Sequence, residues 1–181
     1  MDSNRILITK LDAARRQLDT SIKLFFVNGD FVSIHALAYA AFTVTRNLCD
    51  ATSNEASFTK WVRNSVAASQ HEELFAALSV AGNFLKHADR DPKRQLEYIP
   101  RQYDILMILA VQMYEGLTHE LTTPMGVFKV WYMIHHPNWC ADPNLRDSIA
   151  RKASDYPKTM PEFYDTVAKA LHIQERRIIE R

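Results

Sequence analysis

The residues best suited to chemistry lie near the middle of the chain, where Asn83, Lys86 and His87 are followed by Arg90 and Asp91. Residues three and four apart share one face of a helix, so the first three side chains project together. An imidazole titrates near neutral pH and can act as acid or base, and an ammonium group can hold a phosphate. We predict a catalytic cluster of Asn83, Lys86 and His87, with Arg90 and Asp91 as binding residues.

A structural role would explain the same cluster. Lysine and histidine near the C-terminal end of a helix are stabilised by the helix dipole, by about 0.3–1 kcal/mol each. Pro92 indicates that the helix ends in this segment. If the cluster is functional instead, His87 should be partly accessible, line a groove and lie within hydrogen-bond reach of Asn83 or an acidic residue.

Other polar clusters lack the spacing of a metal site. His135 and His136 are adjacent, so on a helix their side chains point about 100° apart, and only Cys140 lies nearby. A zinc site needs three or four converging ligands. Glu115 and His119 are four residues apart without the HExxH motif. We predict no bound metal and no cofactor.

The helices that would position these side chains follow from apolar residues recurring every three or four positions. Gly29 should end the first helix in a left-handed conformation, Asp30 should cap the second, and Thr122 and Thr123 should supply the cap of the sixth, ahead of a first-turn proline at 124. No convincing strand pattern occurs. The sequence predicts an all-α single domain over residues 1–181, a bundle of about five long helices with shorter C-terminal helices and a subdomain change near residue 137. The expected helices span about 4–26, 31–49, 58–66, 101–121, 123–136, 143–153 and 161–177, and a fourth helix opens at 70 and ends in the polar cluster, broken by residues 89–92.

Two predicted helices are apolar over most of their circumference. The helix at 31–49 contains His35, which we expect to be a hydrogen-bonded core histidine. In the helix at 101–121, Ile105, Ile108 and Leu109 add a second apolar side. Because one small bundle can bury few such helices, we predict a homodimer with a helix–helix interface.

Composition limits the classes of function. Lysine and arginine total 22 against 21 acidic residues, so any role with RNA or DNA would need a local basic patch. Cys49 and Cys140 are far apart and form no CxxC pair, which favours reduced thiols. The N-terminus has no signal-peptide pattern, and no window approaches the roughly 18 apolar residues of a membrane span. These features favour a cytoplasmic protein without membrane contact.

Five stretches carry a family resemblance, namely residues 11–19, 24–26, 29–30, 33–38 and 83–92. They resemble a family of uncharacterised bacterial helical proteins, over about the first two-thirds of the chain. More loosely, the whole chain resembles the HEPN superfamily, whose members are small helical bundles, often dimeric, common in toxin–antitoxin and phage-defence systems.

Active HEPN ribonucleases carry an arginine and a histidine separated by four to six residues, the first of which is polar. The resemblance maps the family histidine onto His87, but Asn83 stands four residues upstream and no arginine occurs at the family distance. Arg63 and Asn64 with His71 have the right residue types at a spacing one residue too long. The resemblance therefore implies the helical bundle more directly than it implies ribonuclease activity.

Three hypotheses for function follow. The first is a HEPN-like cytoplasmic protein of a defence, toxin–antitoxin or stress system, which binds a protein partner, a nucleotide or RNA through the cluster around His87. The second is a metal-independent ribonuclease that uses His87, helped by Lys86 and Asn83. The third is a helical interaction or regulatory subunit without a site.

Overall fold

The fold is built from helices throughout the part of the chain that the structure describes. The computed structural model describes residues 5–87, 89, 91–99, 101–140 and 142–179, with backbone alone for 173–179. No strand occurs within these ranges, so the predicted all-α fold is confirmed. The elements are α1 (Lys10–Phe26), α2 (Phe31–Ala51), α3 (Phe58–Ser65), η1 (Ala68–Gln70), α4 (His71–Lys86), α5 (Tyr103–Thr118), α6 (Thr123–His135), η2 (Pro137–Trp139), α7 (Pro143–Lys152), η3 (Ala153–Asp155) and α8 (Met160–Ile179).

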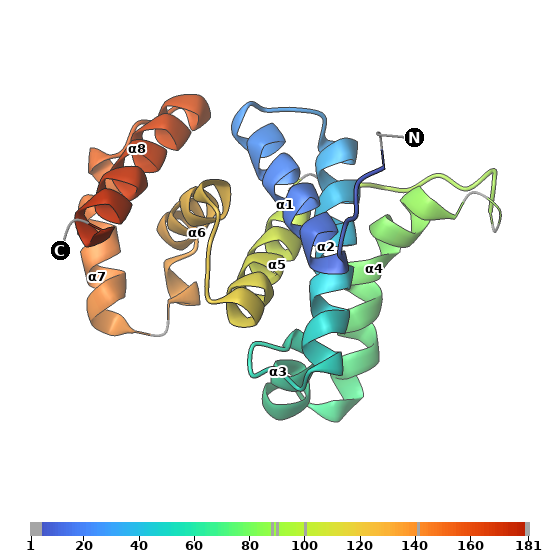
Figure 1. Cartoon of the computed structure of the whole chain (residues 1–181). Helices are drawn as coiled ribbons and strands as arrows, with labels where there is room; N and C mark the ends of the chain where they lie inside the picture. The colour runs from blue at the N-terminus through green and yellow to red at the C-terminus, as the bar shows by residue number, and fades with distance from the viewer. Residues whose placement is uncertain (1–4, 88, 90, 100, 141, 180–181) are drawn as a thin grey trace.

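Helix α2 is the centre of the N-terminal half. It packs most extensively against α1 and α5, and α4 runs along another of its sides (Figure 1). Its buried residues include Ile34, Ala38, Phe42 and Cys49. Small alanine side chains let neighbouring helices approach closely, and each fully buried large apolar side chain contributes about 1.5–3 kcal/mol.

An aromatic cluster joins the two halves of the chain. The ring of Phe25 in α1 meets those of Phe128 and Trp131 in α6 edge-on, with centroids 5.5 and 4.7 Å apart. Phe26 stacks on Phe163 of α8 at 6.0 Å. Such aromatic pairs add about 0.5–1.5 kcal/mol beyond area burial. The C-terminal helix α8 therefore shares the core of the N-terminal helices, at the opposite end of the molecule from α4 (Figure 1).

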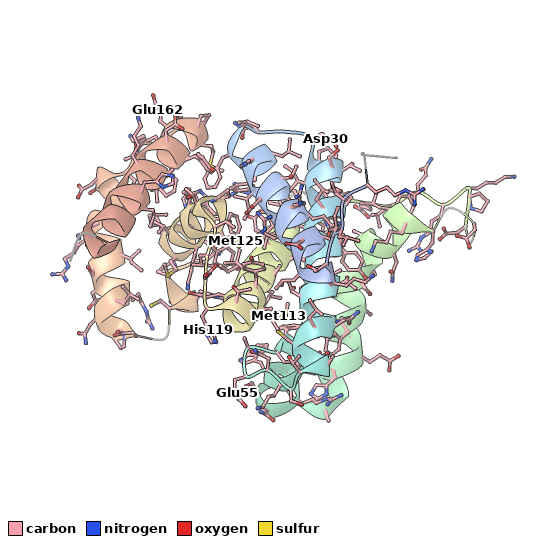
Figure 2. The ribbon with its side chains drawn as sticks, viewed as in Figure 1. Asp30, Glu55, Met113, His119, Met125 and Glu162 are labelled. Carbon is pink, nitrogen blue, oxygen red and sulfur yellow. The ribbon has the colours of Figure 1, made fainter. Side chains whose placement is uncertain are left out.

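Local capping signals fix several helix starts. The Asp30 carboxylate accepts a hydrogen bond from the Ser33 N–H at 2.7 Å, and Asp30 stands at the start of α2 in Figure 2. The Thr122 hydroxyl oxygen caps α6 by accepting from the Met125 N–H. Both predicted caps are confirmed, because capping depends on residues close in sequence.

Some predicted boundaries are wrong. Helix α1 begins at Lys10 rather than near residue 4, because Thr9 and Asp12 form a reciprocal capping box. Asn28, not Gly29, takes the left-handed conformation after α1, with φ 52°. Helix α5 is shorter than predicted and ends before His119, whose φ is 59°.

The premise of the predicted homodimer is also wrong. Helix α5 was expected to leave a second apolar side uncovered, but Ile108 and Leu109 are only 1% and 6% exposed within the single chain. Neighbouring elements already cover most of α5, so a second copy is not needed to bury it. A homodimer remains a prediction and would need another surface.

Candidate functional site

Helix α4 ends at Lys86, inside the polar cluster where the sequence predicted its end and shortly before the expected break at 89–92. His87 is the C-terminal cap, and its N–H donates to the Asn83 carbonyl at 3.1 Å. The His87 side chain is 37% exposed. Asn83, His87, Asp91 and Arg94 line one pocket of about 260 Å³, backed by apolar side chains such as Phe84.

Charged groups surround His87 at moderate distances. Its Nδ1 lies 3.9 Å from the Asp89 carboxylate, which is within ion-pair range but too long for a hydrogen bond. Asp91 is paired with Arg94 at 3.1 Å. Among the described residues, His87 has no side-chain hydrogen bond to Asn83. The expected accessible histidine in a groove is present, while the expected hydrogen bond is not. Arg90 lies outside the described residues.

Lys86 does not join this pocket. Its ammonium group lies over the Tyr39 ring, 4.6 Å from the centroid, and the Tyr39 hydroxyl donates to the Asn83 Oδ1 at 3.3 Å. Gly82 makes this docking feasible, because a Cβ there would lie 2.2 Å from the same ring. The expected convergence of Lys86 with His87 is therefore wrong: the Tyr39 ring of α2 attracts Lys86 to the α2–α4 interface instead.

The remaining sequence candidates make local contacts. The His71 Nε2 lies 2.9 Å from the Val66 carbonyl oxygen, while Arg63 and Asn64 line a different hollow that His71 does not reach. His35 is 2% exposed, and its Nδ1 lies 3.1 Å from the Tyr98 hydroxyl, which confirms a hydrogen-bonded core histidine. Burial lowers the pKa of His35 to about 4.

Histidines and cysteines do not gather into a metal site in the described ranges, where no group of three or more potential ligands occurs. The His135 Nδ1 lies 2.8 Å from the Trp131 carbonyl oxygen. The Cys140 thiol contacts the carbonyl of Asp142 at 3.5 Å. The prediction of no bound metal remains a prediction that elemental analysis can test.

A second cleft, absent from the sequence predictions, lies between the start of α5 and the end of α6. It measures about 510 Å³, within the range of small-molecule sites. Arg101 stands at this cleft with its side chain 56% exposed. Its backbone is left-handed, with φ 70°, a conformation that costs a residue with a Cβ about 1–2 kcal/mol.

Two aromatic rings and one carboxylate hold Arg101 in place. The guanidinium lies 5.2 Å from the Trp131 ring centroid and 5.7 Å from that of Phe25. Its Nε donates to the Asp104 carboxylate at 3.4 Å. This is the sole hydrogen bond that the guanidinium makes to a described residue. The N–H groups of both terminal nitrogens can therefore donate to a ligand.

The other wall of the cleft carries two exposed imidazoles on buried aromatic rings. His135 stacks on Trp131 and His136 on Tyr132, each with centroids 4.3 Å apart. Burial, His135 and Arg101 lower the pKa of His136, which is therefore neutral at pH 7. A neutral imidazole offers a flat face for stacking without the hydration of a charged one.

Asp104 is the most strongly perturbed acid in this cleft. It is 8% exposed, and its Oδ1 is buried with no hydrogen-bond partner among the described residues. Burial raises the pKa of Asp104 to about 6, although Arg101 acts in the opposite direction. Perturbed acids in clefts mark candidate functional sites. As pH falls through 6, Asp104 loses its charge and Arg101 becomes an uncompensated cation.

Comparison with known proteins does not identify the site. No family model matches the chain, and no curated protein or solved structure matches it either. The HEPN resemblance therefore stands on the sequence features described above. None of the helices in the described part of the chain combines the length and apolar character that a membrane span requires.

Proposed function

We propose that this protein binds a phosphate-bearing aromatic ligand, a nucleotide or a nucleotide unit of single-stranded RNA, in the cleft between α5 and α6. The observation that carries the proposal is Arg101. Its guanidinium is held over an aromatic floor by a left-handed backbone, and its terminal nitrogens have no hydrogen-bond partner among the described residues. A planar guanidinium binds phosphate oxygens through two parallel hydrogen bonds.

The His135 and His136 imidazoles supply the second half of the recognition. Both side chains are exposed, and each is supported from behind by a buried ring. Bases of single-stranded nucleic acids stack on aromatic and histidine side chains, with about 1–3 kcal/mol per base. A nucleotide base would stack on an imidazole while its phosphate meets Arg101.

The whole-chain charge is consistent with a local site. With a formal net charge of +1 the protein has little long-range attraction for a polyanion. Binding would depend on the one cation of the Arg101–Asp104 pair. We therefore infer recognition of one or two nucleotide units rather than a long duplex. The cytoplasmic, HEPN-like defence or stress setting remains part of this proposal and is supported by the sequence resemblance.

A ligand panel tests the class of ligand. Isothermal titration calorimetry on the full chain would compare AMP, adenosine and inorganic phosphate at pH 7.5 and pH 6. AMP should bind more tightly than either fragment, because only AMP engages both Arg101 and the imidazole faces. Oligoadenylate, whose diester phosphates keep one negative charge each at both pH values, should bind more tightly at pH 6, because the Asp104 carboxylate gains a proton. Equal affinity for AMP and phosphate would show that the cleft binds a simple anion and does not recognise the base. No binding of AMP would reject the proposal.

A second candidate function is a metal-independent ribonuclease at the His87 pocket. It is favoured by the presence of His87, Asp91 and Arg94 in one pocket, where an imidazole and a guanidinium lie near a carboxylate. An imidazole could transfer a proton while Arg94 holds the phosphate. The test is side-by-side expression of the wild-type protein and His87→Ala, with cell growth and bulk RNA integrity as readouts. RNA decay that persists with His87→Ala would exclude this role.

A further inference from the structure

An exposed apolar segment precedes α1. Ile6, Leu7 and Ile8 are 71%, 104% and 49% exposed. They belong to no helix or strand, and the Thr9–Asp12 capping box starts α1 immediately afterwards. Three consecutive large apolar residues facing water are unusual in a soluble monomer and indicate an interaction surface. We call residues 5–9 the arm.

An apolar groove lies elsewhere on the same chain. Two adjoining hollows of about 540 and 560 Å³ run between α3, α4, α5 and η2. They share Phe58, Trp61, Leu109 and Trp139. Trp61 and Trp139 are 54% and 37% exposed. Figure 2 marks one end of the groove by Glu55, next to α3, and Met113 on α5.

We propose that the groove of one copy takes the arm of a second copy, so that two copies exchange arms. The arm does not occupy its own groove, because Leu7 is fully exposed in its own chain. In an extended conformation, three residues span roughly 10 Å. The arm thus offers a short apolar ridge, and the groove offers a tryptophan-lined hollow for it.

The charges around the two surfaces are complementary. Arg5 and Lys10 flank the apolar triplet of the arm. Glu73 lines the groove as an exposed carboxylate and has no ion-pair partner among the described residues. The chain therefore carries both a basic apolar arm and a groove with an acidic rim. The proposed contact joins the arm of one copy to the groove of another, which are two different surfaces. Reciprocal exchange closes it into a dimer, whereas one-way exchange would extend it.

Sedimentation equilibrium on the full chain tests the proposal. The wild-type protein should form a dimer at micromolar concentration. Leu7→Asp, at a fully exposed position that folding does not need, and Trp61→Ala should each weaken association at least roughly tenfold. Val27→Asp is the matched control, because Val27 is 63% exposed but belongs to neither surface. Val27→Asp should leave association unchanged.

The decisive measurement mixes Leu7→Asp with Trp61→Ala. Leu7→Asp retains an intact groove and Trp61→Ala an intact arm, so their mixture should associate more strongly than either variant alone. A symmetric groove–groove dimer would show no such recovery. If Trp61→Ala fails to fold, Glu73→Lys at the exposed rim replaces it as the groove variant. A monomeric wild-type protein, unaffected association in Leu7→Asp, or no recovery on mixing would overturn the proposal.

Discussion

The pH dependence of stability should change in a defined way when Asp104 becomes asparagine. Burial raises the pKa of this carboxyl from 3.8 to about 6 in the folded protein. A change of one unit in a pKa on folding changes the free energy of unfolding by up to 1.36 kcal/mol. The full effect of Asp104 on the free energy of unfolding is therefore about 3 kcal/mol. The folded state holds the proton more tightly than the unfolded state. The contribution of Asp104 to stability is therefore fully present below pH 3.8 and is lost as pH rises through 6.

His35 acts in the opposite sense over nearly the same window. Burial lowers its pKa from 6.5 to about 4. Its contribution is fully present above pH 6.5 and is lost as pH falls through 4, with a similar magnitude of about 3 kcal/mol. In the wild-type protein the two buried groups should nearly cancel. Removing the Asp104 carboxyl should leave the acid sensitivity of His35 unopposed.

Urea unfolding of the wild-type protein and Asp104→Asn at pH 4, 5, 6 and 7.5 measures this difference. Between pH 7.5 and pH 4, the variant should lose about 2.5 kcal/mol more free energy of unfolding than the wild-type protein, because pH 4 is slightly above the pKa of the unfolded carboxyl. All other titrating groups are common to both proteins and cancel in the comparison. Parallel stability curves would show that Asp104 titrates normally, and would refute the burial argument for this cleft.

Three further predictions concern the α4 cluster and metals. Gly82→Ala should destabilise the protein in thermal melts, because overpacking against the Tyr39 ring costs roughly 1–3 kcal/mol. This cost outweighs the gain in helix propensity. Gly126→Ala is the control and should be neutral or stabilising, since its Cβ would meet only the tip of the flexible Leu171 side chain. His87→Ala should change the free energy of unfolding by less than about 1.5 kcal/mol, and a larger loss would assign His87 a structural role. Elemental analysis should find no zinc in protein purified without added metal, and near-stoichiometric zinc would contradict this.

Features that depend on neighbouring residues could be predicted from the sequence. The apolar periodicity gave the helices, and Asp30 and Thr122 were identified as caps from their type and position. The end of α4 within the polar cluster followed from the polar residues and Pro92, although the helix ends at Lys86, slightly before the predicted break. The start of α1 was predictable too, because the pair of Thr9 and Asp12 has capping-box spacing.

Features that depend on packing between helices could not be predicted in the same way. Lys86 shares a helix face with Asn83, but its orientation depends on the Tyr39 ring of another helix. The cleft around Arg101 is formed by the start of α5 and the end of α6, which the fold alone brings together. In the sequence, the only indication of this cleft was an arginine, Arg101, three residues before an acid, Asp104, at a helix start. Such pairs are common on helix surfaces.

The most direct test of the proposed binding site compares two matched arginines. Arg101 pairs with Asp104, and Arg94 pairs with Asp91, each three residues apart. A fluorescently labelled oligoadenylate of a few nucleotides would be titrated into the wild-type protein, Arg101→Asn and Arg94→Asn at pH 6. Asparagine tolerates the left-handed backbone at position 101. We expect Arg101→Asn to weaken binding at least roughly tenfold and Arg94→Asn to match the wild-type protein. Loss of binding in Arg94→Asn alone would contradict this account and assign the ligand to the pocket around His87.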